Sequence, residues 1–164
     1  MWRDDLKLAV EFYASGPPMI DPIFLWSVNW PSNNPWPEKL PSCDSLLDFY
    51  ALCDGGCFGP MMNFLAMVDL PVQTKKWIET LRNYDDNGDV LIPQRHLVIA
   101  NDADGAPWVF DATDQSVQCY YWKSGEWCDP RYDSHDDFMD AMMYKDPNSA
   151  DWIKTLEIMR QTNG

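Results

Sequence analysis

The sequence predicts one α+β domain in which a mainly antiparallel, mixed-type sheet is flanked by helices. Apolar residues recur at helical spacing in several stretches, while the run from residue 91 to residue 128 breaks into short strand-like segments separated by tight turns. Consecutive short strands joined by turn-length connections pair with their neighbours as an antiparallel meander. The 164 residues suit a single domain with a sizeable core.

The composition is that of a globular protein. Hydrophobic residues make up 46% of the chain and aromatic residues 14%, with nine Trp. The longest apolar runs span only a few residues, so we expect no membrane-spanning segment. The N-terminal stretch MWRDDLKLAV has two acids where a signal peptide has a basic region, so we expect a cytoplasmic protein.

The cysteines fit a reducing compartment. Their number is odd and no signal peptide is evident, which favours free thiols that act as small buried hydrophobes. Cys53 and Cys57 are near zinc-ligand spacing, but no second Cys or His pair completes four ligands, so we expect no metal and no cofactor. The five residues are Cys43, Cys53, Cys57, Cys119 and Cys128.

Acidic residues are concentrated in one part of the chain. The formal net charge is −14, and residues 85–144 hold 13 acids and three bases, a net of −10. Such a field repels phosphate backbones, so nucleic-acid binding is disfavoured. The same field would speed association with a basic protein, and plain solubility is the alternative explanation.

The N-terminal part begins with a helix and continues as an irregular segment. Residues 2–14 place apolar side chains on one face, and Gly16-Pro17-Pro18 ends the helix. Prolines interrupt the stretch from residue 19 to residue 41, where residues 23–28 fit a short strand or a buried extended segment. The indoles of this stretch are too apolar to leave in water, so we expect them to pack against the core: Trp26, Trp30 and Trp36.

Residues 40–56, LPSCDSLLDFYALCDGG, have the features of one complete helix with its start and stop signals. Ser42 and Asp44 are placed to cap its first amides, and Gly55-Gly56 supplies the positive φ that closes a helix C-terminus. The helix is expected to anchor the fold and to contribute little chemistry. Its apolar stripe is Leu46, Leu47, Phe49, Tyr50 and Cys53.

The middle of the chain predicts one further helix and then the strands. Residues 61–68 fit a strand or a second buried element, and residues 74–84 fit a helix capped by Thr74. Strands are expected over 91–100, 107–112 and 117–122, with a tight turn at 101–105, and Gly125 turns the chain into Trp127 and Cys128.

Two helices are expected after the strands. Ser134 and Asp137 have the spacing of a capping box, and the buried side of this helix would be Phe138, Met139, Met142 and Met143. A last helix over 150–161 would bury Trp152, Ile153, Leu156 and Met159.

Few residues offer catalytic or metal-binding chemistry. Residues 83–94 imitate a calcium loop, but its twelfth position is Gln94 and not the bidentate Glu, so we expect a polar turn. His96 and His135 are the only histidines, and no nucleophile motif lies near either of them. His135 stands in a run of Asp and is expected to be a surface helix cap. No active site is predicted from these residues, so we expect no enzyme, with a calcium-assisted enzyme as the weakest alternative.

Residues 40–56 resemble the LP-x-x-Y-x-x-F-L-x-x-x-N-G-G signature of the SUKH superfamily, which includes yeast cell-wall-synthesis regulators and many bacterial immunity proteins. Leu40, Pro41, Leu47 or Phe49, and Gly55-Gly56 match, whereas Asp44 or Ser45 replaces the aromatic and Asp54 replaces Asn. The stretch LVIANDADGAPWVFDATDQSVQCYYW is similar to the strand-turn-strand section of the family, with Asp111 after the second strand, and SHDDFMDAMMY is similar to its closing helix.

The resemblance covers about residues 38–145 of a single domain spanning 1–164. The N-terminal helix with the Trp/Pro-rich segment, 1–37, and the C-terminal helix, 148–162, lie outside it. The family resemblance implies an α+β fold with helices around the sheet and no shared catalytic residues. It also implies an immunity-type protein that binds and neutralises a toxin domain delivered by neighbouring bacteria. A non-catalytic regulatory or scaffold protein of the same superfamily is the alternative.

The resemblance and the acidity together predict which residues contact a cognate, basic toxin. Carboxylates in the turns and at the rim would steer the partner, and exposed Tyr and Trp side chains would anchor it. For any one of the aromatics, packing in the core is the competing interpretation. The predicted partner-binding set is Asp102, Asp104, Asp114, Tyr120, Trp122, Trp127, Asp129, Tyr132, Asp133, Asp136 and Asp137.

Overall fold

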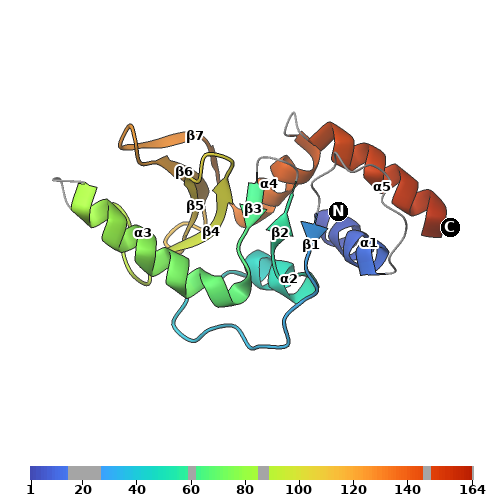
Figure 1. Cartoon of the computed structure of the whole chain (residues 1–164), viewed down its shortest axis with the longest axis horizontal. Helices are drawn as coiled ribbons and strands as arrows, with labels where there is room; N and C mark the ends of the chain where they lie inside the picture. Colours follow the sequence, from blue (N-terminus) through green and yellow to red (C-terminus); the bar gives the residue numbers. More distant parts are fainter. Residues whose placement is uncertain (15–26, 59–61, 85–88, 146–148, 164) are drawn as a thin grey trace.

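The computed structural model describes residues 1–14, 27–58, 62–84, 89–145 and 149–163, and it confirms the α+β class (Figure 1). The helices are α1 (Trp2–Ala14), α2 (Asp44–Leu52), α3 (Leu70–Tyr84), α4 (His135–Asp140) and α5 (Ser149–Asn163), with a 3-10 turn η1 (Met67–Asp69) and a π-helical turn η2 (Ala141–Lys145). The strands are β1 (Ser27–Val28), β2 (Gly56–Cys57), β3 (Met62–Phe64), β4 (His96–Asp102), β5 (Pro107–Asp111), β6 (Val117–Tyr121) and β7 (Glu126–Tyr132).

The strands form one sheet in which each strand pairs with the next along the chain, and every pairing is antiparallel. The predicted meander is therefore confirmed, and β7 is an edge strand. The first long strand begins at His96 and not at Leu91, because Pro93 has no N–H to donate and Gln94 adopts a φ of +67°. The N–H groups of Arg95 and His96 instead bond the Ile92 carbonyl in a turn.

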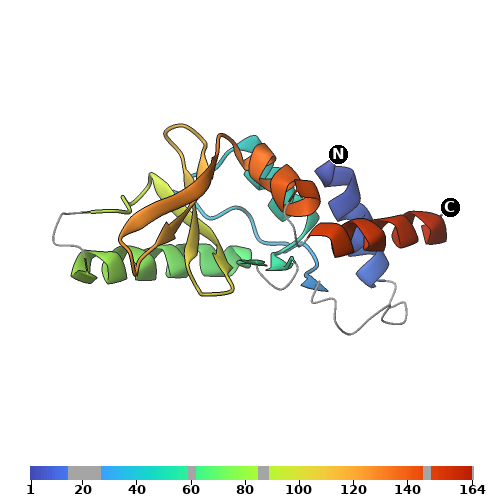
Figure 2. The ribbon, with the colours of Figure 1, turned by 90° about the horizontal axis from the view of Figure 1, so that it is seen from above.

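Helices pack on the sheet and on one another in two groups (Figure 2). The helix α3 runs along β4, while α4 places Phe138 against Trp108 of β5, with ring centroids 5.2 Å apart. Beyond α2 and α4, α1 and α5 pack together at the end of the molecule where both termini lie. The core continues through Phe49 and Phe64, whose ring centroids are 5.0 Å apart.

The stretch from Leu40 to Gly56 does organise the fold, although not by the predicted caps. The N-cap residue of α2 is Cys43, and no side chain caps it, so the predicted capping by Ser42 or Asp44 is wrong. Four of the five predicted stripe residues are buried, whereas Leu47 is 38% exposed. The hydroxyl of Tyr50 donates to the Leu65 carbonyl at 2.8 Å, which fastens α2 to the chain leaving β3.

Gly55 is required by a close approach and not by the helix end. The C-cap residue is Cys53 in an extended conformation, two residues earlier, so the prediction that Gly55-Gly56 closes the helix is wrong. Gly55 has a φ of +73°, and a Cβ atom built there would lie 2.6 Å from the carbonyl oxygens of Phe64 and Leu65. The neighbouring Asp54 accepts a 2.6 Å hydrogen bond from the N–H of Met67, which starts η1.

The structure also corrects the start of α3. The helix begins at Leu70, four residues before the predicted start, with Pro71 in its first turn where a missing N–H costs nothing. Thr74 is therefore inside the helix, and its hydroxyl accepts a 3.0 Å hydrogen bond from the Val98 N–H of β4. Ile78 and Leu81 are buried and Trp77 is half-buried, as predicted for this side of the helix.

The Ser134 cap is confirmed, because its hydroxyl oxygen accepts a hydrogen bond from the Asp137 N–H at 3.0 Å. In α5, Leu156 and Met159 are buried, whereas Ile153 is 38% exposed, contrary to prediction; the side chain of Trp152 lies outside the described ones.

All five cysteines are free; Cys53 and Cys119 are buried, and the other three are half-buried.

The Trp-rich segment packs only in part. Trp36 is half-buried beside Tyr50, with ring centroids 5.6 Å apart, but Trp30 is 63% exposed, so the expectation for Trp30 is wrong. Trp26 and residues 23–25 lie outside the described residues.

Among the described helices, none has the length and apolar character needed to cross a membrane.

Candidate functional site

The sheet separates the predicted partner-binding residues into three groups, one at each end of the sheet and one between the ends. Because the strands alternate in direction, the β4–β5 and β6–β7 turns lie at one end of the sheet, and the β5–β6 turn and the end of β7 lie at the other. Asp102, Asp104 and Trp122 therefore belong to the first end. The other end holds Asp114, Asp133, Asp136 and Asp137, and β6 and β7 carry Tyr120, Trp127, Asp129 and Tyr132 between the two ends.

The four predicted aromatic anchors differ in exposure. Tyr120 is 3% exposed and belongs to the core, so it offers no surface to a partner. Tyr132 is half-buried against Phe138, with ring centroids 5.4 Å apart, and Trp122 is half-buried beside Tyr84. Trp127 is 39% exposed, and of the four it is the one that presents its ring to solvent.

Most of the predicted carboxylates already have partners within the protein. Asp136 accepts hydrogen bonds from Trp2 Nε1 at 2.7 Å and from Arg3 Nη1 at 2.8 Å, which joins α1 to α4. Partial burial alone would raise the pKa of Asp136, but these two donors lower it. The other internally bonded carboxylates are Asp102 in its own turn, Asp114 and Asp133 with Arg131, and Asp137 with Ser134.

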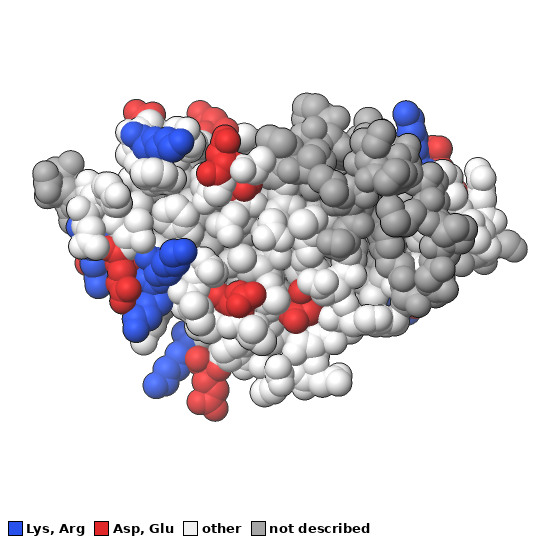
Figure 3. Space-filling view, in the orientation of Figure 1, with Lys and Arg blue, Asp and Glu red and all other residues white. Residues whose placement is uncertain are grey.

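Uncompensated negative charge is left on the exposed edge of the sheet. Every residue of β7 except Cys128 and Tyr132 is exposed. Within the described part of the chain, Glu126 and Asp129 of β7 and Asp104 of the β4–β5 turn form no ion pair. The face seen in Figure 3 is largely uncharged; Lys and Arg side chains lie over α3, and both acidic and basic side chains lie over the strand turns at the top of the view.

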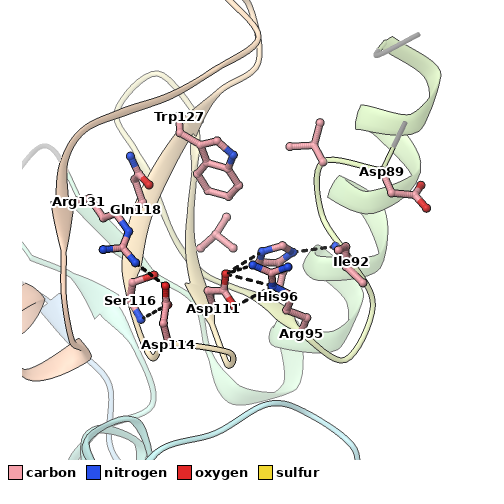
Figure 4. A pocket seen from close by; sticks show the side chains of 12 residues that line it. Asp89, Ile92, Arg95, His96, Asp111, Asp114, Ser116, Gln118, Trp127 and Arg131 are labelled. Atoms are coloured by element: carbon pink, nitrogen blue, oxygen red, sulfur yellow. Dashed lines mark hydrogen bonds and ion pairs between the residues drawn. The ribbon is translucent and has the colours of Figure 1, made fainter. Parts of the chain in front are cut away.

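An open groove of about 440 Å³ lies between β5–β7 and the segment that follows α3 (Figure 4). We call it the β7 groove. Its apolar lining is Val90, Ile92, Val109 and Trp127. Its charged lining is Asp89, Asp111, Asp114, Arg95 and Arg131.

A hydrogen-bonded network forms one end of this groove. Both nitrogens of His96 face internal groups: Nδ1 accepts from the Ile92 N–H at 2.8 Å, and Nε2 lies 3.4 Å from Asp111 Oδ2. Arg95 donates to both carboxylate oxygens of Asp111 at 2.8 to 3.2 Å (Figure 4). The imidazole therefore carries its proton on Nε2 and has no nitrogen available to act as a base.

The charges of this network follow from its geometry. Burial lowers the pKa of His96, and this outweighs the opposing effect of Asp111, so the ring is neutral at pH 7. Partial burial would raise the pKa of Asp111, but the Arg95 guanidinium, the Thr113 N–H and His96 hold it well below its usual range. The network is an internal brace between the 89–95 segment and the sheet.

Sequence reasoning missed most of this groove. Asp114 and Trp127 were predicted partner residues, whereas Ile92, Arg95 and Arg131 were given no role. In a regular hairpin that starts from the pair Asn101 and Pro107, His96 would lie opposite the residue next to Asp111. The bulge between Val98 and Ala100 shifts the register by one residue, so that His96 lies opposite Asp111 itself. The proximity of His96 and Asp111 could therefore have been predicted from the spacing of the two residues in the hairpin.

A second pocket, of about 470 Å³, lies where the N-terminal ends of α2 and α4 meet. The predicted surface role of His135 is wrong: the residue is 1% exposed, and its Nδ1 shares a 2.8 Å hydrogen bond with Ser45 Oγ. Complete burial lowers the pKa of His135 to about 3, and burial raises the pKa of the nearby Cys43 thiol. Neither a proton-accepting imidazole nor a thiolate is thus favoured here at pH 7.

The calcium-like segment can be judged only at its ends, because residues 85–88 lie outside the described ones. Asp89 accepts a 2.6 Å hydrogen bond from Arg82 Nε, so one of its oxygens is already in use. No group of three or more His, Cys, Asp or Glu side chains suited to holding a metal ion occurs in the described residues.

No family model matches the chain, and no curated protein matches it.

Proposed function

We propose that this chain is a cytoplasmic, non-catalytic binding protein of the immunity type, which neutralises a basic bacterial toxin domain by direct contact. The observation that carries the proposal is the edge of the sheet: β7 is exposed along its length, it presents the Trp127 ring, and Glu126 and Asp129 have no ion-pair partner in the described residues. A half-exposed indole flanked by unneutralised carboxylates is suited to anchoring and attracting a cationic protein.

Two further features support the proposal. The net charge of −14 favours fast association with a cation-rich surface. The resemblance of residues 40–56, 97–122 and 134–144 to the SUKH superfamily supplies the kind of partner, a toxin domain, and suggests that inhibition occurs by covering the toxin's active site. The neutral, internally bonded states of His96 and His135 agree with a role that needs no catalyst.

The test is co-expression of this chain with the toxin domain encoded beside its gene, scored by rescue of bacterial growth. Rescue is expected, together with co-purification of the two proteins and an association rate that falls as salt is raised. Binding without rescue would make the chain a scaffold, and an association rate independent of salt would remove the electrostatic part of the proposal.

A further inference from the structure

We infer that the β7 groove receives a lysine or arginine side chain of the partner, with its aliphatic stem on Trp127 and Ile92 and its charged head beside the groove's carboxylates. This inference rests on the proposed function and deepens it, because it assigns the groove as the anchor point and names the side-chain chemistry that enters it.

The apolar part of the groove is exposed but already ordered. Trp127 is 39% exposed and Ile92 is 40% exposed, whereas Val109 beneath them is 2% exposed. The indole is held between Tyr120, at 5.2 Å between ring centroids, and His96, at 6.0 Å. A ring fixed in this way can accept a hydrocarbon stem and a cation without first losing side-chain freedom.

The charged part of the groove favours a cation over an anion. Three carboxylates and two guanidinium groups line it, and the internal pairs Asp111–Arg95 and Asp114–Arg131 use both guanidinium groups. Asp89 is paired with Arg82, which is not a lining residue, and its side chain remains 52% exposed. A carboxylate with one oxygen engaged still has lone pairs for a further donor.

His96 provides no positive charge that would stabilise a bound anion. Protonation of Nδ1 would break its hydrogen bond with the Ile92 N–H, so the imidazole stays neutral and adds no positive charge to the groove. The groove also lies in the part of the chain with a net of −10. A carboxylate or phosphate group would therefore have to displace an internal ion pair against this field, whereas a Lys or Arg head would not.

The first experiment uses short peptides as probes of the groove. The full chain is labelled with 5-fluorotryptophan, and the Trp127 and Trp30 signals among its nine tryptophans are assigned by the variants Trp127→Phe and Trp30→Phe. Three capped octapeptides are added in turn: Arg alternating with Gly, the same peptide with citrulline for Arg, and the same peptide with Asp for Arg. Citrulline keeps the size and polarity of Arg but removes its charge.

The Arg peptide is expected to shift the ¹⁹F signal of Trp127, and the citrulline and Asp peptides are not. Trp30 is the matched control, because it is the more exposed indole at 63% and lines neither pocket. Equal shifts of Trp30 and Trp127 would overturn the inference in favour of unspecific attraction. No response of Trp127 to the Arg peptide, or a response to the Asp peptide, would overturn it as well.

The second experiment uses the toxin domain from the growth test. Trp127→Ala should weaken its binding about thirtyfold, the size of a typical anchor residue, while Trp127→Phe keeps most of the affinity and Trp30→Ala leaves it unchanged. Unchanged binding by Trp127→Ala would remove the groove as anchor but leave the immunity function intact. Failure of rescue with a preserved Trp127 response to the Arg peptide would instead remove the toxin as partner and keep the cation-binding groove.

Discussion

The molecule uses the same three side-chain types, His, Asp and Arg, in two networks with different surroundings. In the first, His135 bonds Ser45, and the adjacent Asp136 accepts from Arg3 and Trp2. In the second, His96 accepts from the Ile92 backbone, and Asp111 holds Arg95. In both networks the imidazole is neutral and the carboxylate keeps its charge.

The two networks differ in what covers them. Helices α1 and α2 lie over the first, so that His135 is 1% exposed and packs against the rings of Trp2, Phe49 and Phe138. Both networks border a pocket, of about 470 Å³ for the first and about 440 Å³ for the second. The β7 groove differs in that an exposed aromatic ring, Trp127, is part of its lining. The network alone therefore does not decide the role: the first joins α1, α2 and α4 around a buried imidazole, whereas the second stiffens a surface that carries an exposed indole.

The largest expected effect lies on the closely packed side. Gly55→Ala should lower the free energy of unfolding by about 4 kcal/mol, or prevent folding, because the residue has a φ of +73° and a Cβ would meet the carbonyl oxygens of Phe64 and Leu65. Gly105→Ala is the control on the open side: its φ is +81°, but nothing lies within 4 Å of the added Cβ, so about 1 kcal/mol is expected. Urea unfolding measures both; equal losses would show that backbone strain alone matters.

The second effect is acid destabilisation through His135. Its pKa is lowered to about 3 in the folded state, while an unfolded His titrates near 6.5, so the unfolded state binds the proton first and stability falls as the pH drops below about 6.5. Between pH 7 and pH 4 this group should remove about 3 kcal/mol of stability. The variant His135→Gln keeps a hydrogen-bonding group for Ser45. Between pH 7 and pH 4 its free energy of unfolding should therefore fall by about 3 kcal/mol less than that of the wild type.

The matched control for the acid effect is His96→Gln. The pKa of His96 is also lowered by burial, so the sign is the same, but Asp111 opposes the shift and the change should be smaller. The remaining titratable groups, Asp136 and Arg3 among them, are common to the wild type and both variants, so the differences between pH series isolate the imidazoles. A pH series for His135→Gln that parallels the wild type would show that His135 is accessible to protons in the folded state.

How far the sequence predicted these two regions differs in a physically simple way. Periodicity and turn residues predicted the class, the meander and the Ser134 cap, because each depends on residues close together in the chain. The burial of His135 was not predictable, because it depends on α1 and α2 folding over a residue that is about 90 positions from Ser45. For the β7 groove, Trp127 and Asp114 were predicted, and the pairing of His96 with Asp111 was readable from the hairpin spacing. The approach of Ile92 to Trp127 was not, because the two residues are far apart in the chain.

A smaller effect separates the two kinds of carboxylate. Asp136→Asn should cost about 1.5 kcal/mol, because Arg3 and Trp2 lose a charged acceptor at the junction of α1 and α4. The two ion pairs are similarly exposed, with side chains 48% and 38% accessible for Asp136 and Arg3 and 47% and 42% accessible for Asp114 and Arg131. The difference rests on the indole N–H of the buried Trp2, which donates to Asp136. Asp114→Asn should therefore cost at most about 0.5 kcal/mol. Thermal unfolding of both variants at low and high salt checks this; a loss for Asp114→Asn as large as that for Asp136→Asn would show that the hydrogen bond from Trp2 to Asp136 adds no stability.

The smallest expected effect on stability is that of Arg131→Gln, a substitution that should also raise the affinity for the cationic partner. Arg131→Gln removes a positive charge from the β7 groove and releases Asp114 and Asp133, so the free energy of unfolding should change by less than about 0.5 kcal/mol. Affinity for the cationic partner should rise about threefold, since one opposing charge near the bound head disappears. Lys154→Gln on α5, at the far end of the molecule, changes the net charge equally and should leave affinity almost unaltered. If Arg131→Gln weakens binding, Arg131 itself contacts an acidic group of the partner, and the groove recognises anions.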